Sequence, residues 1–402
     1  MIRRSIRVAY FAGTMRPEHD GVTRVLYRLV NYLNNNDIRH VFFSPIVPSS
    51  EYGTQFHRVP SVTFPLYKDY RFALPGTRHF EQELQAFRPD ILHINSPCSL
   101  GYAAVKFAEQ HNIPVVATYH THFASYAKYY NIAALEGLSW AYIRRLYNRC
   151  QRVFVPSQPI LDELHTHGLR TLEFLPHGVD AETFNPKQKD TAWKQTIGAE
   201  GKRVLLFAGR LVWEKDLKTL AEAYRILTAK RNDAVFVLAG DGPVREELKQ
   251  LMPEAIFLGH QSKQDLAVAY ASSDLFVFPS TTETFGNVTL EAMASGLPPI
   301  CAREGGAFGI IRDGSTGLLA KPRCPTDFVR NIELLLDDGR LRESVSKQAF
   351  AFAQQQQWEH IFNRMFASYQ NVLHEFSQFQ ERKGRRGHGA SVYYRPSFGS
   401  AH

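Results

Sequence analysis

The chain has 402 residues, of which 44% are hydrophobic and 21% are charged. These values are ordinary for a soluble globular protein, and the length suggests roughly two domains. The formal net charge of +8 favours an anionic partner such as a phospholipid or a nucleotide. We expect no nucleic-acid partner, because no helix-turn-helix, zinc-finger or aromatic RNA-binding signature is present.

The cysteines and the apolar runs point to a reducing compartment. The four cysteines form no Cys-x-x-Cys pair and are widely spaced, at Cys98, Cys150, Cys301 and Cys324. Neither a zinc site nor a disulfide framework is indicated. No apolar run reaches the length of a membrane span. Soon after Met1 the chain enters the apolar run 6–11, which predicts a buried strand rather than a secretory signal. We therefore expect a cytoplasmic protein.

In the first half of the chain, short apolar runs alternate with amphipathic stretches. The expected strands are residues 6–12, 40–44, 91–94, 115–118 and 152–156. The expected helices, in which apolar residues recur at helical spacing, are residues 21–33, 81–86, 101–111 and 135–148. Strands that alternate with helices favour a parallel sheet covered on both faces.

The pattern starts again after a charged segment, residues 187–203. The second set of expected strands is 204–208, 235–239, 256–258, 275–278 and 299–301. The second set of expected helices is 216–230, 244–251, 263–272, 287–295 and 326–336, and a further helical stretch spans 344–376. The chain is thus predicted to be an α/β protein with two doubly wound, Rossmann-like domains that face each other across a cleft. Ligands are expected at the carboxyl ends of the strands.

These patterns divide the chain into four parts. Residues 1–186 form the first domain, and residues 187–345 form the second. Residues 346–380 form a helical segment that is expected to cross back to the first domain. Residues 381–402 form a basic tail without apolar periodicity, which we expect to be disordered.

The most informative stretch follows the expected strand 275–278. Glu283 lies in the loop after this strand, and Glu291 lies one turn into the next helix. Gly286 between them allows a ligand to approach the backbone closely. A helix N-terminus suits a phosphate, and the two carboxylates could bind hydroxyl groups on either side of it. This arrangement fits a nucleotide-sugar; the alternative is a capped surface helix with two solvated acids.

A second candidate site follows the first strand of the second domain. In Gly209-Arg210-Leu211-Val212-Trp213-Glu214-Lys215, Arg210 offers a planar fork of donors and Lys215 a compact charge. Such a pair suits adjacent phosphates, although surface charge is the alternative. The turn Gly240-Asp241-Gly242-Pro243 after the next strand is interpreted as structural.

The motifs of the first domain disfavour several kinds of functional site. Its first strand leads to a loop from Gly13 to Gly21 that is not Gly-x-Gly-x-x-Gly, which disfavours a nicotinamide-binding oxidoreductase. Gly21, at the start of a helix, still permits an anion. In Tyr119-His120-Thr121-His122 the two histidines are expected to point to opposite faces, so a shared metal ion is disfavoured. His120 is either a hydrogen-bond donor to a ligand or a satisfied structural histidine. No Gly-x-Ser-x-Gly, Walker or His-Glu-x-x-His motif occurs.

Taken together, these motifs resemble those of the retaining glycosyltransferases of family 4, which have the GT-B fold. The resemblance covers nearly everything from Ile6 to about Leu373. The motifs that carry it are Asp20-Gly21-Val22-Thr23-Arg24, Thr118-Tyr119-His120-Thr121, Pro176-His177-Gly178-Val179-Asp180, Gly209-Arg210 with Lys215, Gly240-Asp241-Gly242-Pro243, and Glu283 with Glu291. Within the family, the first two motifs are most similar to those of bacterial and plant enzymes that add mannose or related sugars to glycolipids.

The resemblance implies four catalytic residues. Arg210 and Lys215 would neutralise the donor diphosphate as it leaves. Glu283 would hold the hydroxyl groups of the donor sugar, and His120 would contact the sugar near the reacting carbon. The configuration of that carbon would be retained. The resemblance implies neither a cofactor nor a metal ion, because the two cations take the part of a divalent cation.

The resemblance also implies a set of substrate-binding residues. The backbone N–H groups of Phe285 and Gly286 would assist Glu283, and those of Asn287 and Val288 would bind the phosphate. Glu291 would bind the ribose, and Gly21 would let its loop approach the diphosphate.

The sequence departs from the family in two places. Many members have two glycines where this chain has Asp20-Gly21, and many carry an acid where it has Ala307-Phe308-Gly309 after Gly305-Gly306.

The acceptor is expected to be a lipid or a saccharide. The aromatic and basic stretch 123–130, together with the helix that leads to Arg152, is expected to lie beside His120. The arginines of this region are Arg144, Arg145, Arg149 and Arg152. They make an anionic membrane surface a candidate partner, with a peripheral position on the inner face of the membrane. The alternative is a buried helix with a solvated basic edge. Residues 67–71 are a second candidate for acceptor contact.

The expected function is transfer of a hexose, mannose in the first instance, from a nucleotide-diphosphate sugar to a glycolipid or polysaccharide. Two alternatives stay open. One is a nucleotide-sugar epimerase or hydrolase of the same fold, and the other is a UDP-sugar-dependent glycolipid transferase of the glucosyl or sulfoquinovosyl type.

Overall fold

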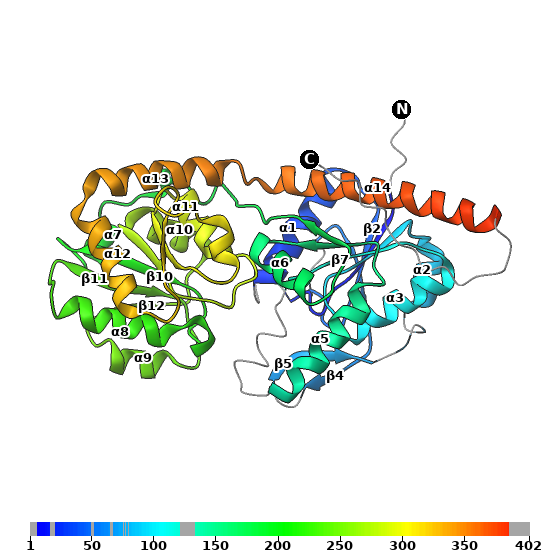
Figure 1. Ribbon diagram of the computed structural model, residues 1–402, viewed down its shortest axis with the longest axis horizontal. Coiled ribbons are helices and arrows are strands. Elements are labelled where there is room, and N and C mark those ends of the chain that lie inside the picture. The colour runs from blue at the N-terminus through cyan, green and yellow to red at the C-terminus, as the bar shows by residue number, and fades with distance from the viewer. Residues whose placement is uncertain are drawn as a thin grey trace. The chain divides into compact units, whose positions relative to one another are not determined.

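The computed structural model describes residues 6–16, 21–49, 52–64, 67–74, 76, 78, 80–120 and 133–385. The chain forms two compact units (Figure 1). Unit 1 contains Met1–Pro156, Leu161–Leu175 and Glu359–His402, and unit 2 contains Ser157–Ile160 and Pro176–Trp358.

Unit 1 is built on a parallel sheet in the order β3-β2-β1-β6-β7-β8-β9. Its strands are β1 (Val8–Phe11), β2 (His40–Ser44), β3 (Gln55–Arg58), β6 (Ile91–Ile94), β7 (Val115–Thr118), β8 (Arg152–Val155) and β9 (Leu172–Phe174). The strand order reverses between β1 and β6, which lie side by side. In open α/β sheets such a reversal leaves a crevice outside the carboxyl ends of the two strands, where ligands bind.

Helices cover this sheet, and the central strands are wholly buried. The helices are α1 (Gly21–Asn35), α2 (Glu81–Phe87), α3 (Ser99–His111), α5 (Ala133–Tyr147) and α6 (Gln158–Thr166), the first three residues of which are grouped with unit 2. All four residues of β1 are buried because both faces of the sheet are covered. Tyr10 stacks on Phe42 of the neighbouring strand at 4.7 Å between ring centroids. A separate antiparallel pair is formed by β4 (Ser61–Phe64) and β5 (Tyr67–Ala73).

The long C-terminal helix α14 (Trp358–Arg385) belongs to unit 1 from Glu359 onward (Figure 1). Its Tyr369 is fully buried, and the hydroxyl group forms a short hydrogen bond with Nδ1 of His93 in β6. Nε2 of His93 lies 2.7 Å from Oγ1 of Thr118 at the end of β7. Burial lowers the pKa of His93 to about 3, so the ring stays neutral at physiological pH. His93 therefore links α14 to the sheet and has a structural role.

Unit 2 is built on a second parallel sheet, in the order β12-β11-β10-β13-β14-β15. Its strands are β10 (Arg203–Ala208), β11 (Ala234–Ala239), β12 (Ile256–Gly259), β13 (Leu275–Phe278), β14 (Pro299–Ala302) and β15 (Leu318–Ala320). The order reverses between β10 and β13, which are hydrogen-bonded neighbours. The loops after these two strands therefore meet at a topological switch point.

The helices of unit 2 complete its core. They are α7 (Trp193–Thr196), α8 (Leu217–Thr228), α9 (Arg245–Leu251), α10 (Lys263–Ser272), α11 (Asn287–Ala294), α12 (Pro325–Asp337) and α13 (Gly339–Gln354). Three single-turn 3₁₀ helices are η1 (Pro186–Gln188), η2 (Trp213–Lys215) and η3 (Gly306–Ile310). Every residue of β11 is buried, as expected for a strand with helices on both faces.

All ten strands predicted from apolar runs lie in the two parallel sheets. The prediction omitted the strands β3, β4, β5, β9 and β15, the helix α6 and the four-residue helix α7. The first four of these strands are partly exposed or short, so they lack a continuous apolar run; β9, for example, has only three residues, none of them buried. Helix α6 begins with Gln158-Pro159, and Pro at this early helical position is its start signal.

The predicted segment boundaries differ from the structure in three places. The chain leaves unit 1 after Leu175, before the boundary predicted at 186, because Val179 donates to the carbonyl of Gln356 (2.7 Å) and Phe184 joins the core of unit 2. The helical segment predicted at 346–380 is divided, since α13 belongs to unit 2 and α14 to unit 1. Helix α14 extends to Arg385, so the start of the predicted disordered tail is helical, and residues 386–402 lie outside the described residues.

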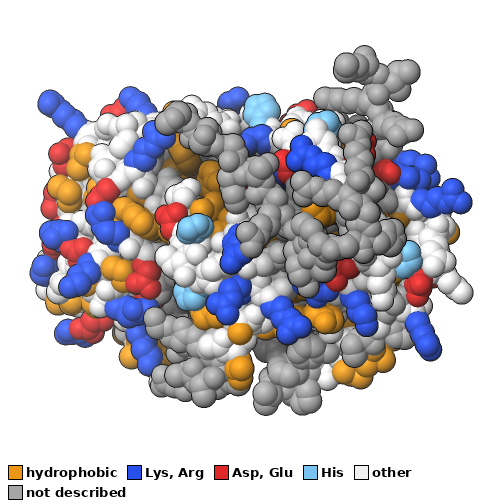
Figure 2. All heavy atoms as spheres, turned by 45° about the vertical axis from the view of Figure 1, so that its right-hand side comes forward, with side chains coloured by type: hydrophobic (Ala, Val, Ile, Leu, Met, Phe, Trp, Pro, Cys, Tyr) orange, Lys and Arg blue, Asp and Glu red, His pale blue; other side chains and the backbone are white. Residues whose placement is uncertain are grey.

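Positive charge is dispersed on the face of the molecule shown in Figure 2, where Lys and Arg side chains stand among acidic and uncharged ones. The net charge of +8 therefore does not by itself mark a basic surface on that face. A binding site for an anion must be argued from particular residues.

Candidate functional site

Two loops of unit 2 meet where the strand order reverses. One loop follows β10 and ends with Lys215, and the other follows β13 and carries Glu283. The ammonium group of Lys215 forms a short ion pair with the Glu283 carboxylate. Oγ1 of Thr282 also donates to the carbonyl oxygen of Glu214, at 3.1 Å. The structure thus brings together a cation and an acid that were predicted from separate motifs.

The loop that carries Arg210 is supported by glycines. Arg210 is exposed and follows Gly209, whose φ is 151°. A Cβ atom on Gly240 would lie 2.0 Å from the carbonyl oxygen of Gly209, and one on Gly242 would lie 2.2 Å from that of Leu211. Both distances are too short for any side chain. The turn 240–243 is therefore structural, as predicted, and it fixes the backbone on both sides of Arg210.

A second glycine pair supports the loop that carries Glu283. The N–H of Gly306 donates to the carbonyl oxygen of Glu283 at 2.6 Å. A Cβ atom on Gly306 would lie 2.2 Å from the backbone nitrogen of Phe285, and one on Gly305 would lie 2.5 Å from the carbonyl oxygen of Thr281. The sequence motifs predicted no role for these two glycines. Two glycines in a row, Gly305-Gly306, are a sequence signal that two backbone segments approach each other closely.

Helix α11 begins directly after this loop. Gly286 occupies the N-cap with a φ of 94°, a left-handed conformation that glycine adopts readily. Asn287 and Val288 are the first two helical residues. The N–H groups at such positions lie outside the helical hydrogen-bond ladder and carry the positive end of the helix dipole. The start of α11 thus presents backbone N–H groups of the kind that bind anions, and the phosphate-binding role of Asn287 and Val288 stays a prediction.

His177 was not predicted as a site residue, yet it contacts the start of α11. Its Nδ1 lies 2.8 Å from Oδ1 of Asn287, and its ring lies 4.9 Å from that of Phe285. Burial lowers the pKa of His177 to about 4, so the ring is neutral at physiological pH. Because the amide oxygen of Asn287 can only accept, Nδ1 is the ring nitrogen that carries the proton and donates it. Gly178 packs so tightly on Trp358 that a Cβ atom would lie 2.7 Å from its backbone nitrogen. The motif 176–180 therefore positions α11 within unit 2.

Glu291 lies on the turn of α11 after Asn287 and is half-buried. The buried hydroxyl group of Tyr270, in α10, donates to its Oε2 at 3.4 Å. This contact orients the carboxylate of Glu291. Glu283 and Glu291 therefore stand at opposite ends of the segment that contains the helix N-terminus, as the sequence predicted.

The two predicted site residues of unit 1 also lie next to a reversal of strand order. Gly21 is the first residue of α1, which follows β1. His120 follows β7, is 8% exposed, and its Nε2 lies 3.2 Å from Oδ1 of Asn95, which follows β6. Asp20, Thr121, His122 and the acceptor segment 123–130 lie outside the described residues. The roles of Gly21 and His120 stay predictions.

The four arginines predicted to lie beside His120 do not share that position. Helix α5 connects back to the start of β8, so its last residues, including Arg144, lie at the amino edge of the sheet, whereas His120 lies at the carboxyl edge. Arg149 pairs with Glu109, and Arg152 pairs with Glu173 and Glu375 at 3.2 Å each. The physical reason is that a helix between two parallel strands runs in the opposite direction to them, so its last turn lies at the amino edge of the sheet.

The second candidate for acceptor contact, residues 67–71, begins strand β5. The guanidinium group of Arg71 donates to Oγ of Ser61 at 2.9 Å and to its carbonyl oxygen at 3.1 Å. Arg71 thus links the two strands of the β4–β5 pair, which gives it a structural use.

Within the described part of the chain, no three His, Cys, Asp or Glu side chains are grouped so that they could hold a metal ion. The expectation of a metal-free and cofactor-free enzyme stays a prediction. Among the described helices, none combines the length and the apolar character that crossing a membrane requires.

Comparison with known proteins decides the family. The family model described as "Glycosyltransferase Family 4" matches residues 19–183, and the one described as "Glycosyl transferases group 1" matches residues 189–352. A GDP-mannose-dependent alpha-mannosyltransferase of Corynebacterium glutamicum is 34% identical over 92% of this chain and 90% of its own length. The chain belongs to glycosyltransferase family 4.

Other relatives of this glycosyltransferase differ in the sugar that their names give. The sulfoquinovosyl transferase SQD2 of Arabidopsis thaliana is 34% identical over 78% of this chain and 62% of its own length. The alpha-monoglucosyldiacylglycerol synthase of Streptococcus pneumoniae is 27% identical over 78% of this chain and 75% of its own. The predicted enzyme class, a hexosyltransferase, is thereby confirmed.

Solved structures support the fold of the glycosyltransferase. Anabaena HepE, solved in complex with UDP and glucose, has a TM-score of 0.74 at 18% identity and covers 91% of this chain and 100% of its own. Sucrose-phosphate synthase from Thermosynechococcus elongatus has a TM-score of 0.76 at 21% identity, over 91% and 99% of the two chains. The predicted GT-B class, with two parallel-sheet, Rossmann-like domains, is confirmed.

Proposed function

We propose that this glycosyltransferase moves mannose from GDP-mannose to a glycolipid acceptor, with retention of the anomeric configuration. The observation that carries the proposal is the junction of the loops after β10 and β13, where Lys215 pairs with Glu283 beside the N-terminus of α11. The choice of donor and acceptor rests on the relatives, foremost the mannosyltransferase of C. glutamicum.

In the proposed reaction, the bond between the anomeric carbon and the donor phosphate breaks, and its electron pair leaves with the nucleoside diphosphate. Arg210 and Lys215 stabilise the charge that develops on the departing phosphate, and the N–H groups of Asn287 and Val288 bind the same anion. The acceptor hydroxyl oxygen forms the new bond to the carbon, and its proton passes to the departing phosphate oxygen. Glu283 positions the donor sugar.

His177 and Glu291 complete the proposed donor site. His177 holds Asn287 in place and thereby fixes the first turn of α11. Glu291, oriented by Tyr270, binds the ribose hydroxyl groups. Neither role requires a metal ion, and no metal is part of the proposal.

The lipid acceptor places the enzyme at the cytoplasmic surface of an anionic membrane in this proposal. Helix α5 supports it, because Leu138 and Tyr142, one turn apart, are 68% and 41% exposed. Large apolar side chains that are exposed on one side of a surface helix suit the headgroup region of a bilayer.

The test measures nucleotide release from a panel of GDP- and UDP-linked hexoses, with and without a diacylglycerol-based glycolipid in detergent. The expected result is GDP release from GDP-mannose that requires the acceptor, together with a mannosylated lipid. Release without acceptor would instead support the hydrolase or epimerase alternative.

A second candidate donor is a UDP-linked glucosyl or sulfoquinovosyl sugar, because SQD2 has the same identity to this chain as the mannosyltransferase, 34%, although over 78% of the chain rather than 92%. The same panel separates the two donors.

A further inference from the structure

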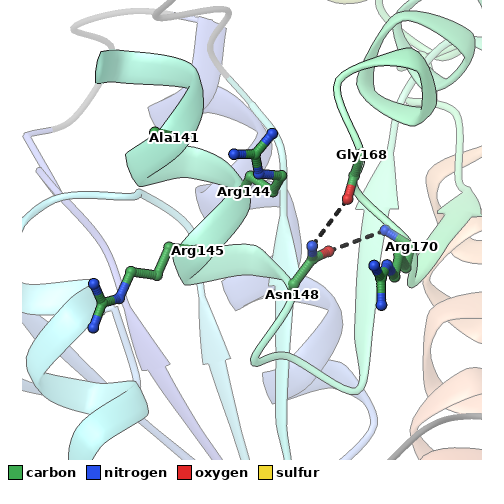
Figure 3. A pocket seen from close by; sticks show the side chains of 6 residues that line it. All are labelled: Ala141, Arg144, Arg145, Asn148, Gly168 and Arg170. Carbon is green, nitrogen blue, oxygen red and sulfur yellow. Dashed lines mark hydrogen bonds between the residues drawn. The ribbon is translucent and has the colours of Figure 1, made fainter. Parts of the chain in front are cut away.

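A hollow of about 590 Å³ lies on the surface of unit 1, between the last turns of α5 and the turn that leads from α6 to β9. Six residues line it: Ala141, Arg144, Arg145, Asn148, Gly168 and Arg170 (Figure 3). Three of the six are arginines, and no carboxylate is among them. The hollow therefore has a strongly positive lining.

The frame of the hollow is held by specific contacts. Asn148 uses both ends of its amide: Nδ2 donates to the carbonyl oxygen of Gly168 at 2.9 Å, and Oδ1 accepts from the N–H of Arg170 at 3.0 Å. Gly168 has a φ of 83°, and a Cβ atom there would lie 3.1 Å from Cδ of Arg144. The turn thus packs closely against the side chain of Arg144, and its positive φ favours glycine.

A stacked pair of aromatic rings packs next to the turn that contains Gly168. Trp140 of α5 and His167, directly before Gly168, stack with 3.7 Å between ring centroids and 13° between planes. Nδ1 of His167 also contacts the carbonyl oxygen of Glu163 in α6, at 2.9 Å. The backbone that carries Arg170 is therefore fixed relative to the helix that carries Arg144.

The arginines of the hollow differ from the nearby Arg149 and Arg152 in their ion pairing. Arg149 and Arg152 are neutralised by carboxylates. For Arg144, Arg145 and Arg170, all exposed, the described part of the chain supplies no ion pair or side-chain hydrogen bond. In Figure 3, Arg144 and Arg170 lie on two sides of the Asn148 contacts, and Arg145 extends to the other side of α5. Arg144 and Arg170 thus form the centre of the positive lining and Arg145 its rim.

The hollow is separate from the site described above. It lies where α5 leads into β8 and where Gly168 and Arg170 lead into β9, so it faces the amino edge of the parallel sheet. His120 and Gly21 follow the carboxyl ends of their strands. A ligand in the hollow would not touch the predicted catalytic residues.

We propose that this hollow, lined by Arg144, Arg145 and Arg170, is a binding site for a phosphate group. Guanidinium groups present planar forks of N–H donors that match phosphate oxygens, and exposed arginines without carboxylate partners keep these donors available. Arg145 adds positive charge at the rim. The shared chemistry is a phosphate, which either a lipid headgroup or a soluble phosphate can supply.

A lipid headgroup is the favoured source, and this preference rests on the proposed membrane function. Leu138 and Tyr142 are exposed on α5, about two turns and one turn before Arg145, respectively. A helix that offers apolar side chains followed by arginines can place the former among lipid chains and the latter among headgroup phosphates. The phosphate site itself does not depend on the identity of the sugar donor.

The test uses the full chain and the double variant Arg144→Gln/Arg170→Gln, with Arg340→Gln as the control. Arg340 is an exposed arginine of α13 in unit 2, and its loss matches the charge change of a single variant. One arm measures sedimentation with vesicles of phosphatidylglycerol and phosphatidylcholine against vesicles of phosphatidylcholine alone. The other arm measures the thermal midpoint in sodium phosphate against sodium chloride of equal ionic strength.

If the lipid is the source, the unmodified chain binds phosphatidylglycerol vesicles, and the double variant binds on the order of tenfold more weakly. If a soluble phosphate is the source, only the phosphate arm responds, and the double variant loses that response. In both cases the Arg340→Gln variant behaves like the unmodified chain. The proposal is overturned if the double variant equals the unmodified chain in both arms, or if the unmodified chain responds in neither.

Nucleotide release from GDP-mannose with detergent-solubilised acceptor is measured in the same variants. The double variant is expected to retain this activity, because neither arginine belongs to the donor site. If the unmodified chain releases no nucleotide in the donor assay, the proposed function is contradicted. The vesicle and phosphate measurements still test the phosphate site, because they do not depend on sugar transfer. If the double variant does not fold, the two single variants replace it. Each is expected to lose less of the vesicle binding or of the phosphate response than the double variant.

Discussion

His177 donates from Nδ1 to Oδ1 of Asn287 over 2.8 Å, and this bond joins a loop near the start of unit 2 to the first residue of α11. The ring is buried against Phe285, so the bond is protected from water. A histidine that must stay neutral to remain buried makes the stability of the protein sensitive to acid.

The stability of unit 2 should fall as the pH decreases from about 6.5 to about 4. The pKa of His177 is lowered from 6.5 to about 4 in the folded chain, so the unfolded chain takes up a proton first. Unfolding is then favoured in this window by at most roughly 3 kcal/mol, and the full stability is present above pH 6.5. Urea unfolding of the unmodified chain and of His177→Asn at pH 7 and pH 4.5 checks this. His93 titrates in both proteins, so an equal loss in the two would contradict the assignment.

Removing either cation of the proposed donor site should reduce sugar transfer severely. Arg210→Ala and Lys215→Ala each remove positive charge from the departing phosphate, and a loss of roughly 10²–10³ in kcat is expected by analogy with a deleted oxyanion-hole donor. Lys218→Ala is the matched control, because this exposed lysine lies in α8, 5.4 Å from the ring of Trp213. Near-normal kcat in both site variants would show that the two cations do not have these roles.

Adding one methyl group to Gly306 should displace the loop that carries Glu283. The new Cβ atom would lie 2.2 Å from the nitrogen of Phe285, and such overpacking costs typically about 1–3 kcal/mol. Gly306→Ala should therefore lower the thermal midpoint and raise KM for the donor. Gly339→Ala is the control, because its nearest contact is the flexible end of Arg342 at 3.6 Å. An active and stable Gly306→Ala protein would disprove the tight contact between the two loops.

Deleting the hydroxyl group of Tyr369 should weaken unit 1. Tyr369→Phe leaves Nδ1 of His93 buried without its partner, and a buried unsatisfied group costs about 1–3 kcal/mol. Tyr32→Phe, which removes a hydroxyl bond to Asn363 at the surface, should cost less. Guanidinium unfolding of both variants measures the difference, and equal losses would argue against a special role of the buried bond.

The sequence predicted the strands of both sheets because their residues are apolar without interruption, as β1 and β11 show. It also located Glu283, Lys215 and Asn287, since motifs at strand ends fall at a sheet edge in any doubly wound fold. It could not show that Lys215 pairs with Glu283 or that His177 contacts Asn287, because these pairs are 68 and 110 residues apart and depend on packing.

The arginines near the end of α5 show the same limit of prediction from sequence. Arg144 and Arg149 are close in sequence and carry the same charge, but one lines an open hollow and the other pairs with Glu109 on α3. Nothing in the local sequence distinguishes them. The direction of α5 and the place of the neighbouring helix decide the use of each residue.

The return of α14 to the first unit has a practical meaning for dissecting this enzyme. A fragment that stops after Leu175 would lack Tyr369, which closes the core beside His93, and would expose that core to water. Expressing unit 1 alone therefore calls for splicing residues 359–385 onto its end, whereas a fragment of residues 176–358 leaves out only Ser157–Ile160 of unit 2.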